Sequence, residues 1–104
     1  MQAAATVFKD NASVPSAQTT VATPGTALQI SNVSIPSAMV FLTAGRNNQG
    51  VITVGGPTVK ASPTGTSGTD LQPGQAITLE IDDLSKVWFD GTATNDIVSF
   101  SYLA

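Results

Sequence analysis

The chain has 104 residues and a mass of 10.6 kDa, which is the size of a single domain. Charged residues make up 11% of the sequence and the net charge is −3, so no basic surface is available to attract a nucleic acid. The absence of Cys and His excludes disulfides, zinc sites built from thiolate and imidazole, and nucleophiles activated by histidine. We therefore expect no nucleic-acid partner, no cofactor, no small-molecule substrate and no enzymatic activity.

The composition favours strands over helices. The β-branched residues Thr, Val and Ile are abundant, Glu and Lys are scarce, and nine Gly and six Pro interrupt the chain. The longest strongly apolar run, residues 38–42, is far shorter than the roughly 20 residues that span a bilayer as a helix, so we expect no membrane association. We predict an all-β fold: a single small β-sandwich or jelly-roll-like domain of about eight short antiparallel strands. The sandwich covers residues 17–104, and residues 1–16 form an N-terminal arm or a first strand.

Two strands are predicted before residue 34. Residues 18–23 are rich in Thr and Val and end at Pro24-Gly25, which predicts a type II turn because Gly adopts positive φ without strain. Residues 27–33 alternate between apolar and polar side chains, so one face of this strand is expected to be buried.

The middle of the chain predicts a hairpin. Residues 39–44 are mostly apolar at successive positions, which is typical of a central strand covered on both faces. A polar loop at 45–50 leads to a second strand at 51–54, and Gly55-Gly56-Pro57 marks its end. Residues 61–75 hold many Gly, Pro, Thr and Ser, so we expect a long surface loop fixed by Leu71.

The last third contains three more predicted strands. Pro73-Gly74 predicts a second type II turn before residues 77–81, whose alternation places Glu80 toward solvent. A turn at 82–85 leads to residues 86–89, where Trp88 takes the face opposite Val87 and Phe89. Asp90-Gly91 and Asn95-Asp96 are expected to be turns, and residues 97–102 form the final strand.

The acidic residues of the C-terminal region allow three interpretations. Asp82, Asp83, Asp90 and Asp96 could supply the oxygen ligands of a calcium ion, although their spacing does not match a calcium-binding loop. A pair chosen from these and Glu80 could hydrolyse a glycoside if a cleft held them apart at the required distance. We favour the third interpretation, in which the Asp side chains stabilise turns.

Four residues are candidates for a partner interface. Trp88 is either a core residue or an anchor for a partner, since Trp is common at both kinds of site. Arg46, the only arginine, lies in a polar loop beside Asn47 and Asn48, where it could pair with a carboxylate of a neighbouring protein or remain solvated.

Most of the chain from Thr19 onward resembles a group of small β-sandwich virion proteins of phages and prophages. The resemblance lies in turn and core residues, at positions 20–28, 47–56, 71–75, 82–93 and 98–102. It implies a virion structural protein, such as a capsid decoration (cement) subunit that binds the outer shell and stabilises it. The implied partners are the major capsid protein and copies of the chain itself, as a trimer or dimer. The implied location is the capsid surface, after synthesis in the host cytoplasm.

Two other functions are kept open. The same group includes head-fibre and adaptor-like proteins, so the chain could be a head-fibre base or tail-associated module that recognises a host glycan through Trp88, Tyr102 and the Thr/Asn loops. A small hydrolase that uses Glu80 and the Asp residues is the third alternative, and the shortness of the chain argues against a cleft deep enough for it.

Overall fold

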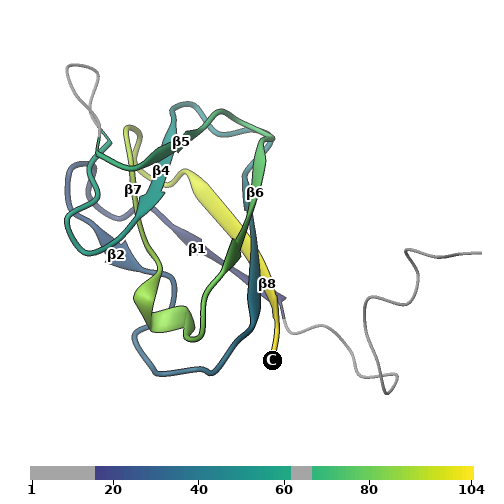
Figure 1. Ribbon diagram of the computed structural model, residues 1–104. Coiled ribbons are helices and arrows are strands. Elements are labelled where there is room, and N and C mark those ends of the chain that lie inside the picture. The colour runs from purple at the N-terminus through teal and green to yellow at the C-terminus, as the bar shows by residue number, and fades with distance from the viewer. Residues whose placement is uncertain (1–15, 62–66) are drawn as a thin grey trace, which may run out of the picture.

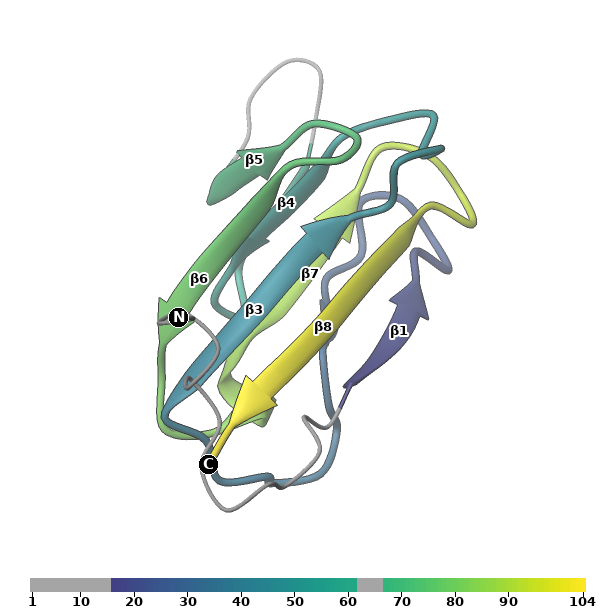
Figure 2. The same ribbon diagram turned by 90° about the vertical axis from the view of Figure 1, so that its right-hand side faces the viewer.

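The computed structural model describes residues 16–61 and 67–104, which form two antiparallel sheets packed face to face (Figure 1). The first sheet contains, in spatial order, β1 (Ser16–Thr20), β8 (Ile97–Leu103), β3 (Met39–Ala44) and β6 (Ala76–Glu80). The second contains β2 (Leu28–Gln29), β7 (Trp88–Gly91), β4 (Ile52–Gly55) and β5 (Thr69–Leu71). Figure 2 looks onto the first sheet, with β6 and β1 at its two edges.

The strand order is that of a jelly roll. Successive strands change sheets at every step except from β4 to β5, so that neighbours within a sheet come from distant parts of the sequence. Every pairing is antiparallel. The prediction of a small all-β sandwich of about eight strands is therefore confirmed.

The core lies between the two sheets and follows the two-residue period of the strands. Val40, Leu42 and Ala44 of β3 are fully buried, while the residues between them face outward. On the opposite sheet, Phe89 is 1% exposed and supplies the largest fully buried side chain. Val87 is buried with it and Trp88 lies on the other face, as the alternation predicts.

Both predicted type II turns are present. Thr26 N donates to Thr23 O at 3.1 Å, and Gly25 has a φ of 91°. Gln75 N donates to Gln72 O at 2.9 Å, and Gly74 has a φ of 86°. Gly at the third position of each turn takes this left-handed conformation with little strain, which explains the Pro-Gly pairs.

The predicted hairpin of residues 39–44 and 51–54 is wrong. The first segment is β3 of one sheet and the second is β4 of the other, so residues 45–51 cross between the layers. β3 is central, as expected, but only one of its faces is covered, because Met39 and Phe41 are half-buried and Thr43 is exposed. Apolar residues on its outer side misled the prediction, since the sequence does not show which face a second layer covers.

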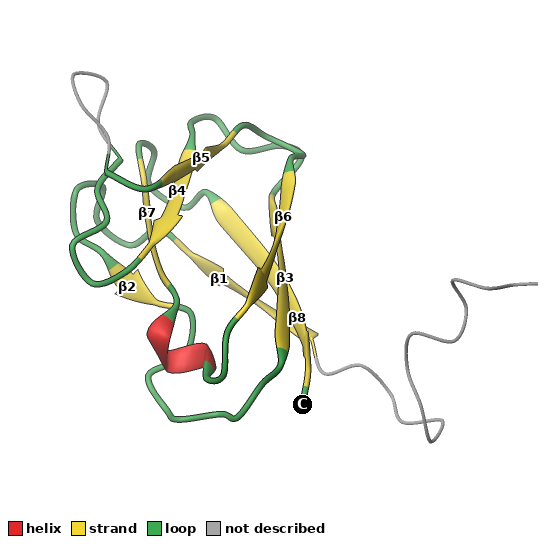
Figure 3. Ribbon diagram, in the orientation of Figure 1, coloured by secondary structure: helices red, strands yellow, loops and turns green. Residues whose placement is uncertain are grey.

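Four local predictions differ from the structure in detail. Asp90-Gly91 continues β7 instead of turning, because the carboxylate of Asp90 is buried and bound by backbone N–H groups. The strand expected at 27–33 is only two residues long, and the turn expected at 82–85 leads into the short 3₁₀ helix η2 (Leu84–Lys86; Figure 3). The long loop expected at 61–75 contains β5, whose Leu71 is buried as predicted. Residues 1–15 and 62–66, and the expectations placed on them, lie outside the described part of the chain.

Candidate functional site

The outer face of the β2-β7-β4-β5 sheet is covered by the protein's own loops. Thr53 and Asp90, which are opposite each other on neighbouring strands of this face, are both fully buried. The Asp90 carboxylate accepts hydrogen bonds from Gly25 N at 2.9 Å, Ala61 N at 2.9 Å and Gly91 N at 2.8 Å. Two segments far apart in the sequence are thereby fixed across this sheet, and the centre of this face is closed to a partner.

No segment within residues 16–61 and 67–104 covers the outer face of the β1-β8-β3-β6 sheet in this way, and we call it the open face. By register and alternation its residues are Ser16, Gln18, Thr20, Met39, Phe41, Thr43, Ala76, Thr78, Glu80, Ile97, Ser99, Ser101 and Leu103. Glu80 is the only charged residue among them, and it is exposed as predicted. The open face is therefore an almost uncharged surface of hydroxyl and amide groups around a few half-buried apolar side chains.

A shallow hollow of about 450 Å³ lies on the open face beside Phe41. Its polar lining comes mainly from β1 and β8, including Gln18, Ser99 and Ser101. Phe41 is directly opposite Ser101 in the strand register, so an aromatic ring is bordered by hydrogen-bonding groups. Such a combination suits recognition of a polar surface that carries an apolar projection.

The loop predicted to contact a partner lies at the end of this face. Arg46 and Asn47 are exposed and line a second hollow of about 350 Å³, which shares Gln18 and Ser99 with the first. The two hollows therefore form one continuous surface. The loop also carries the single arginine, so a positive charge lies beside a face whose charged residue is Glu80.

Asn48 has an internal structural role in this loop. Its side-chain amide donates to Ile97 O at 2.9 Å and accepts from Ile97 N at 2.8 Å, as a neighbouring strand would. Asp96 accepts from Gln49 N at 2.9 Å and from Gly50 N at 2.8 Å. These bonds hold the crossing between the sheets in place and leave the exposed side chains of Arg46, Asn47 and Gln49 available to a partner.

The structure does not bring Trp88 together with the loop residues. Trp88 is half-buried on the outer side of the second sheet, opposite Gln29 and Gly55. Tyr102, the other aromatic residue considered for glycan binding, is packed against the core. The aromatic residue on the open face is Phe41, which the sequence interpretation missed. Its alternation with Val40 and Leu42 could have revealed it, had an uncovered outer face been considered.

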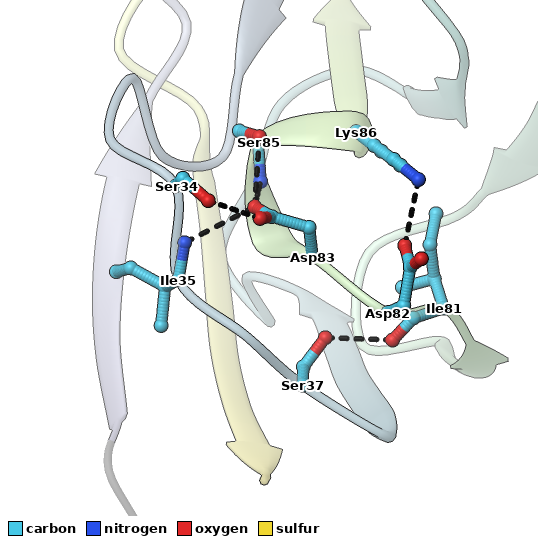
Figure 4. A network of polar contacts seen from close by, with 8 residues as sticks. All are labelled: Ser34, Ile35, Ser37, Ile81, Asp82, Asp83, Ser85 and Lys86. Carbon is cyan, nitrogen blue, oxygen red and sulfur yellow. Dashed lines mark hydrogen bonds and ion pairs between the residues drawn. The ribbon is translucent and has the colours of Figure 1, made fainter.

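Asp83 joins two loops at the opposite end of the sandwich (Figure 4). Its carboxylate accepts bonds from the Ser34 hydroxyl, from Ser85 N at 2.9 Å, from the Ser85 hydroxyl at 2.7 Å and from Ile35 N at 3.1 Å. Hydrogen bonds from Ser34, Ser85 and Ile35, the first of them most strongly, hold the pKa of Asp83 well below its usual range. Asp83 thus caps η2 and ties it to the segment that leads into β3.

Asp82 forms an exposed ion pair with Lys86 at 2.8 Å (Figure 4). The hydrogen bond and charge of Asp82 raise the pKa of Lys86. Because both side chains are well exposed, this pair contributes little to stability.

The acidic residues have separate structural tasks. Asp83, Asp90 and Asp96 bind backbone N–H groups in different parts of the fold, which supports the interpretation that they stabilise local structure. Within residues 16–61 and 67–104, no three His, Cys, Asp or Glu side chains are grouped where they could hold a metal ion. The geometry offers a rigid surface for binding, with its polar groups presented by strands.

Comparison with known proteins found no match: neither a family model, nor a curated protein, nor a solved structure corresponds to this chain. In the part of the chain that the structure describes, no helix has the length and apolar character needed to cross a membrane. The surface geometry and the sequence resemblance therefore carry the functional argument.

Proposed function

We propose that the protein is a phage virion structural subunit that decorates the capsid, binding the outer shell through its open face and stabilising the particle. The observation that carries this proposal is the asymmetry of the sandwich. One outer face is fastened by Asp90 to the protein's own loops, whereas no other described segment covers the second face, whose described residues include one charged side chain, Glu80. The resemblance to small virion β-sandwich proteins supplies the class of partner.

The scaffold suits a non-catalytic structural role. Among the described residues, no buried side-chain nitrogen or oxygen lacks a hydrogen-bond partner, which favours a rigid domain. A shell presents many equivalent sites, so modest contacts at each copy add up when the subunits are themselves associated. The partners proposed are the major capsid protein and further copies of this chain, at the capsid surface.

Variants of the open face test this proposal. Thr43→Glu places a charge at an exposed position of the hollow, and Phe41→Ala removes its aromatic ring. Both are expected to lower cosedimentation with undecorated capsids by tenfold or more, since each weakens an uncharged contact. Val33→Glu is the matched control, because Val33 is 62% exposed and lies outside the open face.

The same capsids provide the functional readout. Particles saturated with the wild-type protein should resist heating and osmotic shock better than bare particles. Equal resistance of decorated and bare particles would contradict a stabilising role, and equal binding of all three variants would contradict the assignment of the open face.

A glycan-binding module is the second candidate, and the hollow beside Phe41 is the observation in its favour. Hydroxyl and amide groups around an aromatic ring could hold a sugar, whereas Trp88 lies on the outer side of the other sheet and Tyr102 packs against the core. A glycan array decides between the two: saturable binding that Phe41→Ala abolishes would favour this candidate, and an array without binding favours capsid decoration.

A further inference from the structure

The four sheet edges of the sandwich differ in how they are protected against pairing with another chain. β2 is only two residues long, β5 is three residues long and carries Asp70, and β6 carries the exposed carboxylate of Glu80. Short length and charge are the usual devices that prevent strand addition at an edge. β1 has neither: its five residues, Ser-Ala-Gln-Thr-Thr, contain no charge and no Pro, and four of them are exposed.

The backbone groups at the free edge of β1 can be assigned from the hydrogen bonds of its neighbours. Val21 N donates to Asp96 O at 2.9 Å, so the backbone groups of Val21 point toward the segment that leads into β8. Gly45 N donates to Ile97 O at 2.9 Å, so the backbone carbonyl of Ile97 points toward the β3 side of β8 and away from β1. The N–H and C=O groups of successive residues point to opposite sides of a strand. The backbone groups of Ala17 and Thr19 therefore bond to β8, and those of Ser16, Gln18 and Thr20 point outward from the free edge, within the plane of the sheet. Figure 2 shows β1 at the margin of the sheet, and none of the strands in the described part of the chain lies beyond it.

These outward groups are symmetric about Gln18. We propose that β1 pairs with β1 of a second copy of this chain, antiparallel and with the two-fold axis at Gln18. Gln18 then faces Gln18 of the second copy, and Ser16 faces its Thr20. Each facing pair exchanges two backbone hydrogen bonds, giving about six bonds in all.

The side chains are compatible with this register. Gln18 of each copy projects on the open face, where the two amides lie directly across from each other and can hydrogen-bond. Ser16 lies across from Thr20, so the joint contains only uncharged polar groups. A chain of net charge −3 can meet its own copy along this edge without opposing like charges.

The paired molecule has one continuous eight-stranded sheet and doubles the open face on one side. This inference concerns the assembly of copies and does not depend on what the assembled protein binds. A negative result would therefore leave capsid binding to be decided by its own experiment.

The test compares matched charge variants of the full chain by sedimentation velocity. At micromolar concentration the wild type should sediment as a dimer, with a mass twice the 10.6 kDa of the single chain. Gln18→Lys places two like charges across the axis and should shift the protein to its single-chain mass. Thr78→Lys is the control, because Thr78 is the exposed central residue of β6 on the same face, and it should remain a dimer.

Mixing provides a positive test that misfolding cannot imitate. Gln18→Glu alone should also be monomeric, and an equimolar mixture with Gln18→Lys should recover the dimer, since opposite charges then meet. In hydrogen exchange, the amides of Ser16, Gln18 and Thr20 should be protected in the wild type and unprotected in Gln18→Lys, while Ala17 and Thr19 stay protected in both.

Four results would overturn the inference. These are a monomeric wild type, a trimeric wild type, a dimer that Gln18→Lys leaves intact, and a monomer in which the amides of Ser16, Gln18 and Thr20 are protected. The last result would show that another part of the same chain covers the edge.

Discussion

Asp90 is the residue whose removal should damage the fold most selectively. Its buried carboxylate binds Gly25 N, Ala61 N and Gly91 N, and the first two belong to segments that cover the second sheet. Hydrogen bonds to a charged group contribute about 1.5–3 kcal/mol each, and a buried N–H left without a partner costs about 1–3 kcal/mol. Part of this lost stability is regained in the variant, because the folded state no longer bears the cost of desolvating the carboxylate.

Asp90→Ala should therefore lower the free energy of unfolding by about 2–4 kcal/mol. Ala61 N is buried and loses its partner, whereas Gly25 is exposed and its N–H can bind water. Domains of this size have about 5–15 kcal/mol of stability in total. With a urea dependence of about 1–2 kcal/mol per molar, the midpoint should fall by roughly 1–4 M.

Urea titration followed by Trp88 fluorescence measures this change. Asp82→Ala is the control, since it removes a carboxylate of the exposed ion pair with Lys86 and should leave the midpoint nearly unchanged. The midpoint of Asp90→Asn should lie between those of Asp90→Ala and Asp82→Ala, because its amide oxygen accepts from the N–H groups on one side of the carboxylate while its amide nitrogen opposes those on the other side. Equal midpoints for Asp90→Ala and the wild type would refute the argument that this carboxylate fastens the loops.

Two further predictions concern packing and pH. A Cβ at Gly91 would lie 2.5 Å from Val21 Cγ2 and 3.2 Å from Ile52 Cδ1. Gly91→Ala should therefore lower the free energy of unfolding, measured by urea titration, by about 1–3 kcal/mol. Gly56→Ala is the control and should be nearly neutral, because a Cβ at Gly56 would have open space around it. Because the folded-state pKa of Asp83 is lowered, its contribution to stability is fully present above its ordinary value of 3.8 and is lost as the pH falls through its lower folded-state pKa. Asp83→Asn should lack this acid-dependent loss in titrations followed by circular dichroism, and an unchanged acid profile would contradict the assigned network.

The sequence predicted the inner side of this fold better than its outer side. Alternation identified the strands that contain Leu79 and Val98, because burial of one face imposes a two-residue period. The Pro-Gly turns were predictable for the same kind of local reason, since positive φ favours Gly.

The connections could not be predicted in this way. The hairpin prediction failed because periodicity shows that a strand has a buried face and does not show which strand lies beside it. Asp90 was taken for a turn residue because Asp is common in turns, and its actual environment depends on Gly25 and Ala61, which are distant in sequence.

The candidate site shows the same limit. Arg46 and Asn47 were predicted as exposed loop residues and line a hollow, but the loop's continuity with the hollow beside Phe41 depends on β1 and β8, which a local pattern does not place. Residue type and alternation predict that Trp88 lies on the face opposite Val87 and Phe89, which is correct, but they do not show that this face belongs to the other sheet.

The position of β8 has a consequence for the order of events during synthesis. β8 lies between β1 and β3, so neither of these strands can form its pairing with β8 until residues 97–103 have left the ribosome. Until then the first sheet cannot be completed. Bringing β1 to β8 closes a long loop, and the conformational entropy lost in this closure is offset only after the two strands have paired. Folding should thus be slow and concerted, and shortening the chain from Ile97 onward should yield aggregation-prone material instead of a smaller domain.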